Sequence, residues 1–284
     1  MSARRRFRPR RALSSLLSYL VLLLILLFAV FPFLWTLAIS LTNKAAPGVS
    51  IYDFPASLFP RSLTLYNFFN VFRTFHLARY FLNSVVITGL TIAGTLLVSA
   101  LAAYPLARMR FPLKNFLFAA IISTLVLPSE INFIVNTLTL KRVHLLGTYW
   151  GVVLPLISTA FGIFLMRQAY LGVPAALTEA AIIDGATDWQ ILWRIMVPLS
   201  SPSLTALGIF TLVNTWNSYF WPMVALLPAP RLAPLAVGML KLKGQFVYDP
   251  FNIAAGAVIM MVPVLIVFVA AQRLFMRGLE GAVK

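Results

Sequence analysis

The sequence predicts an all-α integral membrane protein with about six transmembrane helices, and two observations support this prediction. The first is composition: 61% of the 284 residues are hydrophobic, only 11% are charged, and the mean hydropathy is +0.90. Soluble domains carry roughly 25% charged residues. The second is that apolar segments of about 20 residues, the length that crosses a bilayer as a helix, recur along the chain. Together they exclude an ordinary soluble domain.

The apolar segments are separated by polar or charged connections. An even number of spans places both chain termini on the same side of the membrane. Residues from about 41 to 80 are polar with prolines and aromatic residues mixed in, so we expect the longest loop outside the membrane there. The predicted spans are Leu16–Ile39, Phe81–Leu106, Asn115–Val135, Tyr149–Tyr170, Leu199–Leu226 and Phe251–Phe275.

The basic residues set the orientation. The net charge is +16, but the basic residues lie between apolar runs and form no basic face at helical spacing, which argues against nucleic-acid binding. The N-terminal RRRFRPRR precedes an apolar run far longer than a signal-peptide core, so we expect a signal anchor. The positive-inside rule then predicts a basic cytoplasmic tail over residues 1–12, a single transmembrane domain over 13–284, and a cytoplasmic C-terminus.

One stretch in the second half, LGVPAALTEAAIIDGATDWQILWRIMVPLSSPSL, is too polar to be a span. Pro174 suits the first turn of a short helix, and Gly185 can take the positive φ that ends it. Thr187 and Gln190 have the spacing of a capping box for a second helix, which Pro198 should stop. The stretch therefore predicts a compact helical hairpin. Its local chemistry leaves two interpretations open: a solvated connector, or a docking surface for a partner.

This hairpin resembles the cytoplasmic loop of the permease subunits of binding-protein-dependent ABC importers. That family carries E-A-A, two residues, D-G-A, and then a helix ending in P-x-x-x-P. Ile182 is more apolar than the residue many relatives have there. The matching residues are Glu179, Ala180, Ala181, Asp184, Gly185, Ala186, Pro198 and Pro202.

Other stretches resemble the carbohydrate-uptake branch of the family, of the maltose and glycerol-phosphate type. They are LTLYNFFNVFRTFHLARYFLNS (63–84), AYPLARMRF (103–111), LGTYWGVVLPLISTAFGIF (146–164) and the C-terminal FMRGLEGAVK. The resemblance thus covers most of the chain. It implies a type I importer permease in a bacterial or archaeal cytoplasmic membrane, with residues 171–198 as the cytoplasmic coupling loop.

The chain has no G-x-x-x-x-G-K-[ST] phosphate loop, so we expect it not to hydrolyse ATP. It has no Cys and its two histidines are far apart, so we expect no metal site, and we expect no cofactor bound by this chain. The resemblance implies that ATP and magnesium sit on two separate ATPase subunits, which dock on Glu179–Ala186. It also implies a second permease subunit and an extracytoplasmic solute-binding protein, with lipid around the spans and no nucleic acid.

Polar residues inside apolar segments are costly and are therefore candidates for the solute path. Amides exchange hydrogen bonds with sugar hydroxyls, and aromatic faces suit the apolar side of a sugar. Such residues also form interfacial belts or helix contacts, so both interpretations stay open. The candidates are Asn214, Trp216, Asn217, Tyr219 and Trp221 in the fifth segment, with Glu130 and Asn132 near the third.

Three alternatives remain from the sequence. The same scaffold could import glycerol phosphate or another polar solute. A stand-alone secondary transporter would fit the composition but would not need the hairpin. A polytopic membrane enzyme would need paired acids, histidines or a Ser-Lys arrangement in the membrane; His76 and His144 are far apart and have no adjacent carboxylate pair.

Overall fold

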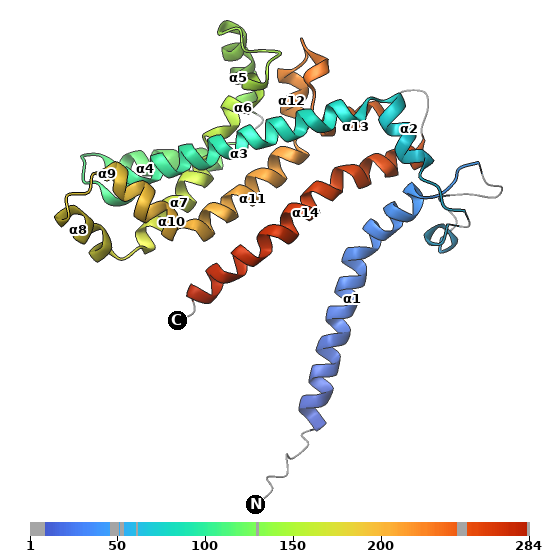
Figure 1. Cartoon of the computed structure of the whole chain (residues 1–284), viewed down its shortest axis with the longest axis horizontal. Helices are drawn as coiled ribbons and strands as arrows, with labels where there is room; N and C mark the ends of the chain where they lie inside the picture. The colour runs from blue at the N-terminus through green and yellow to red at the C-terminus, as the bar shows by residue number, and fades with distance from the viewer. Residues whose placement is uncertain are drawn as a thin grey trace, which may run out of the picture. The chain divides into compact units, whose positions relative to one another are not determined.

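The computed structural model of the chain (Figure 1) describes residues 9–45, 51, 54–60, 62–128, 131–242 and 249–282. Within these ranges the regular structure is helical, and an isolated antiparallel bridge joins Thr42 to Leu63. The chain divides into two compact units, residues 1–74 with 245–258, and residues 75–244 with 259–284. The prediction that residues 13–284 form a single domain stays a prediction.

The first unit contains α1 (Pro9–Ser40), the short 3₁₀ helix Ala56–Leu58, α2 (Tyr66–Thr74) and the start of α14 (Pro250–Ala282). Asn67 of α2 is buried, and its Nδ2 donates to the backbone carbonyls of Ser40 and Thr42, each at 2.9 Å. These bonds satisfy carbonyls at the end of α1, where no intrahelical donor is available. The predicted loop at 41–80 therefore carries a helix of its own.

The start of α14 is capped by Asp249. Its Oδ1 accepts from the backbone N–H of Phe251 at 3.1 Å and of Asn252 at 3.3 Å. Its Oδ2 accepts from Lys44 Nζ at 2.7 Å and from Asn252 Nδ2 at 2.9 Å. An acid at a helix N-terminus satisfies free N–H groups and complements the helix dipole.

The second unit is built along α3 (Leu77–Arg108), which packs against α6 (Tyr149–Ile157), α7 (Ala160–Gly172), α11 (Ser201–Asn217) and α13 (Leu235–Leu242). The buried face of α3 is lined by small polar side chains, which let neighbouring helices approach closely. These are Ser84, Thr88, Thr91, Thr95 and Ser99.

Three helical segments among the described residues are long and apolar enough to span a membrane unbroken: Leu17–Ser40, Leu77–Arg108 and Pro250–Ala270. Three further candidates are bent helix pairs, which bring the number to six if each pair counts as one span by length and composition. The first half of one pair, Asp188–Leu199, belongs to the stretch that the sequence predicts to be too polar for a span. The pairs are Lys114–Val126 with Ile131–Arg142, bent by 108°, Tyr149–Ile157 with Ala160–Gly172, bent by 45°, and Asp188–Leu199 with Ser201–Asn217, bent by 76°.

The predicted fifth span, Leu199–Leu226, is not one continuous helix. The helix ends at Asn217, and a separate α12 runs from Phe220 to Ala225. Pro222 explains the break, because the ring of a helical proline clashes with the carbonyl four residues earlier, here Ser218. Apolar content is similar on both sides of this break, so hydropathy alone does not reveal it.

Candidate functional site

The predicted hairpin is present as two helices with a tight turn. The first is α8 (Ala175–Ile183); the second begins with α9 (Asp188–Ile191) and continues through a π-helical segment, Leu192–Met196, and α10 (Val197–Leu199). Gly185 has φ +79°, a conformation that side-chain-bearing residues rarely adopt. Thr187 and Gln190 form both bonds of the capping box, at 3.3 and 2.9 Å.

Two details of the hairpin differ from the prediction. Pro174 lies just before α8 rather than in its first turn. Pro198 does not stop the second helix, because it lies inside α10, and the helix ends one residue later at Leu199. A proline is tolerated near a helix end, where the carbonyl four residues back belongs to an already widened π turn.

The six motif residues divide between surface and core. Ala181 and Ala186 pack against the hydrophobic core cluster at the base of the hairpin. The other four, Glu179, Ala180, Asp184 and Gly185, are exposed. Large apolar side chains are exposed beside them: Ile183 is 85% exposed, and Ile182 and Trp189 are each 61% exposed. The hairpin therefore presents an apolar surface with two acidic groups, which is unfavourable in water unless a partner covers it.

The base of the hairpin is anchored in the second unit. Its core cluster joins α3, α7 and the second hairpin helix through buried side chains such as Tyr170, Ile191 and Met196. Arg167 Nε donates to the carbonyl of Leu106 at 3.0 Å, and its guanidinium lies 4.0 Å from the ring centre of Phe118. The exposed motif residues are thus held by a well-packed support.

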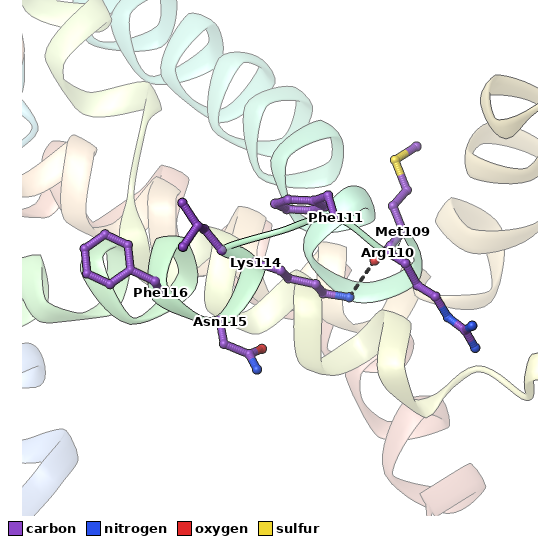
Figure 2. A pocket seen from close by; sticks show the side chains of 7 residues that line it. Met109, Arg110, Phe111, Lys114, Asn115 and Phe116 are labelled. Carbon is purple, nitrogen blue, oxygen red and sulfur yellow. Dashed lines mark hydrogen bonds between the residues drawn. The ribbon is translucent and has the colours of Figure 1, made fainter.

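The turn from α3 into α4 (Lys114–Ser123) encloses a shallow pocket of about 360 Å³ beside the same support. Figure 2 shows the Lys114 side chain folded back toward the carbonyl of Met109, to which its Nζ donates at 2.9 Å. Nζ also donates to the carbonyl of Ala107 at 3.3 Å. The lysine closes the end of α3, because a cation at a helix C-terminus satisfies free carbonyls. We therefore assign this turn a structural role in ending α3.

A larger cavity, of about 610 Å³, lies between α5 (Ile131–Arg142), α6, α7, α11 and α12. Its size falls within the usual range for small-molecule sites. Five aromatic side chains line it, Phe133, Phe161, Phe210, Phe220 and Trp221, together with Leu156 and Leu207. Its polar lining consists of Thr159, Thr211, Asn214, Thr215 and Ser218. No charged side chain is among the described residues that line it.

The aromatic rings are fixed by mutual contacts. Phe133 lies 4.9 Å from Phe220 and 5.9 Å from Trp221 between ring centres, and is stacked on the latter. Phe161 and Phe210 meet edge to face at 5.5 Å. Trp221 Nε1 donates to the buried carbonyl of Val152 at 3.1 Å, so the indole is anchored by its N–H.

Asn214 is the polar group best placed to bind a solute in this cavity. Its amide is exposed and makes no hydrogen bond with the described part of the chain. Thr211 differs, since its hydroxyl donates to the carbonyl of Leu207 at 2.8 Å and keeps only acceptor capacity. A free amide in a concave, mostly apolar site can fix the orientation of a hydroxyl-bearing ligand.

The structure brings only some of the predicted path residues together. Asn214 and Trp221 line the cavity. Trp216 is buried elsewhere and donates from Nε1 to the carbonyl of Met260 at 2.9 Å. Asn217 Nδ2 donates to Val213 of its own helix at 2.8 Å, and Tyr219 is half exposed. Asn132 is exposed outside the cavity, and Glu130 lies outside the described residues.

Sequence reasoning missed most of the aromatic lining. Phe133, Phe161 and Phe210 come from three different segments, and their rings read as ordinary lipid-facing residues in a hydropathy profile. Thr159 could have been found: it caps α7 by accepting from the N–H of Gly162 at 3.0 Å, a helix-start pattern inside an otherwise apolar run.

Comparison with known proteins places these features in a family. Residues 95–281 match the model of the family described as binding-protein-dependent transport system inner membrane component. The arabinooligosaccharides transport system permease protein AraQ of Halalkalibacterium halodurans is 34% identical, over 97% of this chain and 99% of that protein. The sn-glycerol-3-phosphate transport system permease protein UgpE of Shigella flexneri is 30% identical, over 95% and 97%.

A solved structure agrees with the family match. It is a bacterial ABC transporter involved in the import of the acidic polysaccharide alginate, with a TM-score of 0.81, 25% identity, and coverage of 94% of this chain and 98% of that one. The chain thus shares its fold and nearly its full length with transporter membrane subunits. It belongs to the family of inner-membrane components of binding-protein-dependent transport systems: it is a multi-pass permease subunit of an ABC importer and not an enzyme.

Proposed function

We propose that this chain forms one half of the translocation pathway for an uncharged saccharide and that its α8–α9 hairpin docks an ATPase subunit. The observation that supports the solute class is the cavity of about 610 Å³, which combines aromatic rings with a free Asn214 amide and has no charged lining residue among those described. The partners are a second permease subunit, two copies of an ATPase and an extracytoplasmic binding protein. Both chain termini lie in the cytoplasm.

The docking part of the proposal concerns Glu179–Ala186. The exposed Ile183 and Ile182 supply apolar area, while the carboxylates of Glu179 and Asp184 can pair with basic groups and fix register. ATP and magnesium are held by the ATPase subunits, and this chain binds no cofactor or metal. Closure of the ATPase pair would move the hairpin and open the pathway to the other side of the membrane in an alternating-access cycle.

The solute part rests on chemistry rather than on any one relative. The similar proteins are named for arabino-oligosaccharides, sn-glycerol-3-phosphate and alginate, so family membership leaves the solute open. A phosphate or uronate would need charge-assisted hydrogen bonds, which the described cavity lining does not offer. Hydroxyls can bond to Asn214, and a sugar's apolar face can lie against Trp221 and Phe133.

Co-purification tests the docking. The tagged chain, co-expressed with its chromosomal neighbours and extracted in mild detergent, should retain an ATPase subunit. Ile183→Asp should release it, because a carboxylate would be buried in an apolar contact. Phe59→Asp, at a side chain that is 76% exposed in the first unit, is the control and should retain it. Equal retention by both variants contradicts docking at the hairpin.

Reconstitution tests the solute class. The complete importer in liposomes, with ATP and the cognate binding protein, should take up a neutral oligosaccharide in preference to glycerol phosphate. Preference for the phosphate overturns the uncharged-saccharide proposal. Uptake by this chain alone in ATP-free liposomes would instead establish a secondary transporter.

A further inference from the structure

The C-terminal turn of α3 holds both arms of the hairpin. Tyr104 Oη donates to Oδ1 of Asp188, the first residue of α9, at 2.8 Å. Arg108, four residues later and so on the same face of α3, donates from Nη2 to the carbonyl of Tyr170 at 2.7 Å and to that of Val173. These carbonyls close the end of α7, where the chain enters the hairpin. The last turn of α3 therefore bonds to the chain both where it enters the hairpin and at the start of the second hairpin helix.

The opposite end of α3 holds a different set of elements. Asn83 Nδ2 donates to the carbonyls of Arg231 and Ala233 at 3.0 and 2.9 Å, and Asn83 Oδ1 accepts from Tyr149 Oη at 2.7 Å. The neighbouring Ser84 Oγ accepts from the N–H of Leu235 at 2.7 Å. These bonds tie the loop before α13, and the first residue of α6, to the N-terminal turns of α3.

Between these two ends α3 is unbroken. Tyr104 lies 21 residues after Asn83, a separation of about 30 Å at the α-helical rise. The helix pairs at Tyr149–Gly172 and Asp188–Asn217 bend by 45° and 76°. In Figure 1, α8 and α9 lie near one end of α3 and α13 near the other. A continuous helix transmits a displacement along its axis, whereas a bent pair can absorb it at the break.

The contact between Tyr104 and Asp188 is well suited to transmit a displacement of the hairpin to α3. Tyr104 is 5% exposed and packs in the core cluster with Ile191 and Met196, so its ring cannot swing freely. Its hydroxyl bonds to a carboxylate, and such charge-assisted bonds are stronger than neutral ones. Asp188 itself is exposed and belongs to the hairpin, so the bond joins an exposed hairpin residue to a buried side chain of α3.

From these contacts we infer that α3 transmits motion of the hairpin to the segment Arg231–Leu235, which leads into α13. Tyr104 is the positioning residue, because its hydroxyl links α3 to Asp188 of the hairpin. The inference rests on the proposed docking of an ATPase on the hairpin. It adds the route by which docking and release reach the far end of the chain. Arg108 keeps the entry to the hairpin aligned with the same helix turn.

The test uses the complete importer and measures solute taken up per ATP hydrolysed. Tyr104→Phe removes the donor and Asp188→Ala removes the acceptor, so each should lower this ratio by about fivefold or more, within the range of typical coupling energies. Asp188→Asn keeps an oxygen that accepts from Tyr104 and should stay near the wild-type ratio. Tyr66→Phe, at an exposed tyrosine in the first unit, is the matched control.

Hydrogen exchange supplies a readout that a purely structural contact would not move. In the wild-type importer, ATP should change the exchange of the segment containing the Leu235 N–H, which Ser84 holds. In Tyr104→Phe this ATP-dependent change should vanish, whereas simple loosening would raise exchange equally with and without ATP. If both Tyr104→Phe and Asp188→Ala keep the wild-type uptake ratio and the wild-type ATP response, the proposed transmission through α3 is wrong. Failure of the wild-type chain to bind any ATPase refutes the proposed docking instead.

Discussion

Gly162 of α7 lies so close to Ser99 of α3 that a Cβ on the glycine would fall 2.3 Å from Ser99 Oγ. The same Cβ would lie 2.7 Å from Thr159 Oγ1, the cap of α7. The two helices therefore approach each other with no room for a methyl group. This is the small-residue contact by which membrane helices gain van der Waals packing.

Gly162→Ala should destabilise the chain, because the added methyl group overlaps two hydroxyl oxygens. The expected loss is about 1–3 kcal/mol, the usual cost of overpacking. Thermal unfolding in detergent, followed by tryptophan fluorescence, measures it. Ser99→Ala in the same chain should recover part of the loss by removing Oγ. Gly89→Ala, where nothing lies within 4 Å, is the control; a loss there equal to that of Gly162→Ala contradicts the explanation.

Gly185→Val should uncouple ATP hydrolysis from transport while leaving the permease in the membrane. Gly185 has φ +79° and open space around it, so the cost is conformational rather than a clash, at about 1–3 kcal/mol for a residue held in a sparsely populated region. The hairpin would relieve that strain by moving the docking surface. Gly185→Asn should be milder, since asparagine tolerates left-handed geometry. Uptake and ATPase rates at equal membrane abundance decide; wild-type transport by Gly185→Val would refute the prediction.

Asn214→Leu should raise the KM for solute uptake, by about tenfold or more if the amide bonds to a solute hydroxyl. The reason is that a solute hydroxyl would then be buried without a partner. Asn217→Leu is the matched control, because Asn217 lies on the same helix but bonds to Val213 outside the cavity. Uptake in proteoliposomes over a range of loaded binding protein gives the comparison. Equal effects of the two substitutions would rule out a specific contact at Asn214.

Asp249→Ala should destabilise the first unit more than Lys44→Ala. Lys44 is 44% exposed in its ion pair with Asp249, and such surface pairs contribute about 0–1 kcal/mol. Asp249 also caps α14, and loss of a helix cap costs about 0.5–2 kcal/mol more. Hydrogen exchange at Phe251 and Asn252 should therefore rise in Asp249→Ala and change little in Lys44→Ala. A larger rise in Lys44→Ala would show that the ion pair dominates.

Part of the turn chemistry of the hairpin could be predicted from the sequence, although the effects of Pro174 and Pro198 could not. The positive φ of Gly185 and the capping box of Thr187 and Gln190 depend on residues within one turn, so spacing was enough to predict them. Family membership followed from the same stretch, because its motif has fixed spacing.

The cavity could not be predicted in the same way. It depends on breaks in helices that hydropathy treats as continuous, and on rings from Phe133, Phe161 and Phe210 that only the fold brings together. Trp216 and Trp221 are five residues apart with similar surroundings in sequence, yet one bonds to Met260 and the other borders the cavity. Positions five apart face different sides of a helix, and the break near Ser218 changes the direction of the chain between them.

That break has a further consequence for how the cavity behaves when no solute is present. Both Ser218 and Thr159 lie at breaks between helices and border the same space, and helix ends leave some backbone groups without an intrahelical partner. Irregular backbone at membrane depth is tolerated where it lines a hydrated space. We therefore expect the cavity to hold water when no solute is bound. A solute would enter by displacing this water and would not need to separate packed side chains.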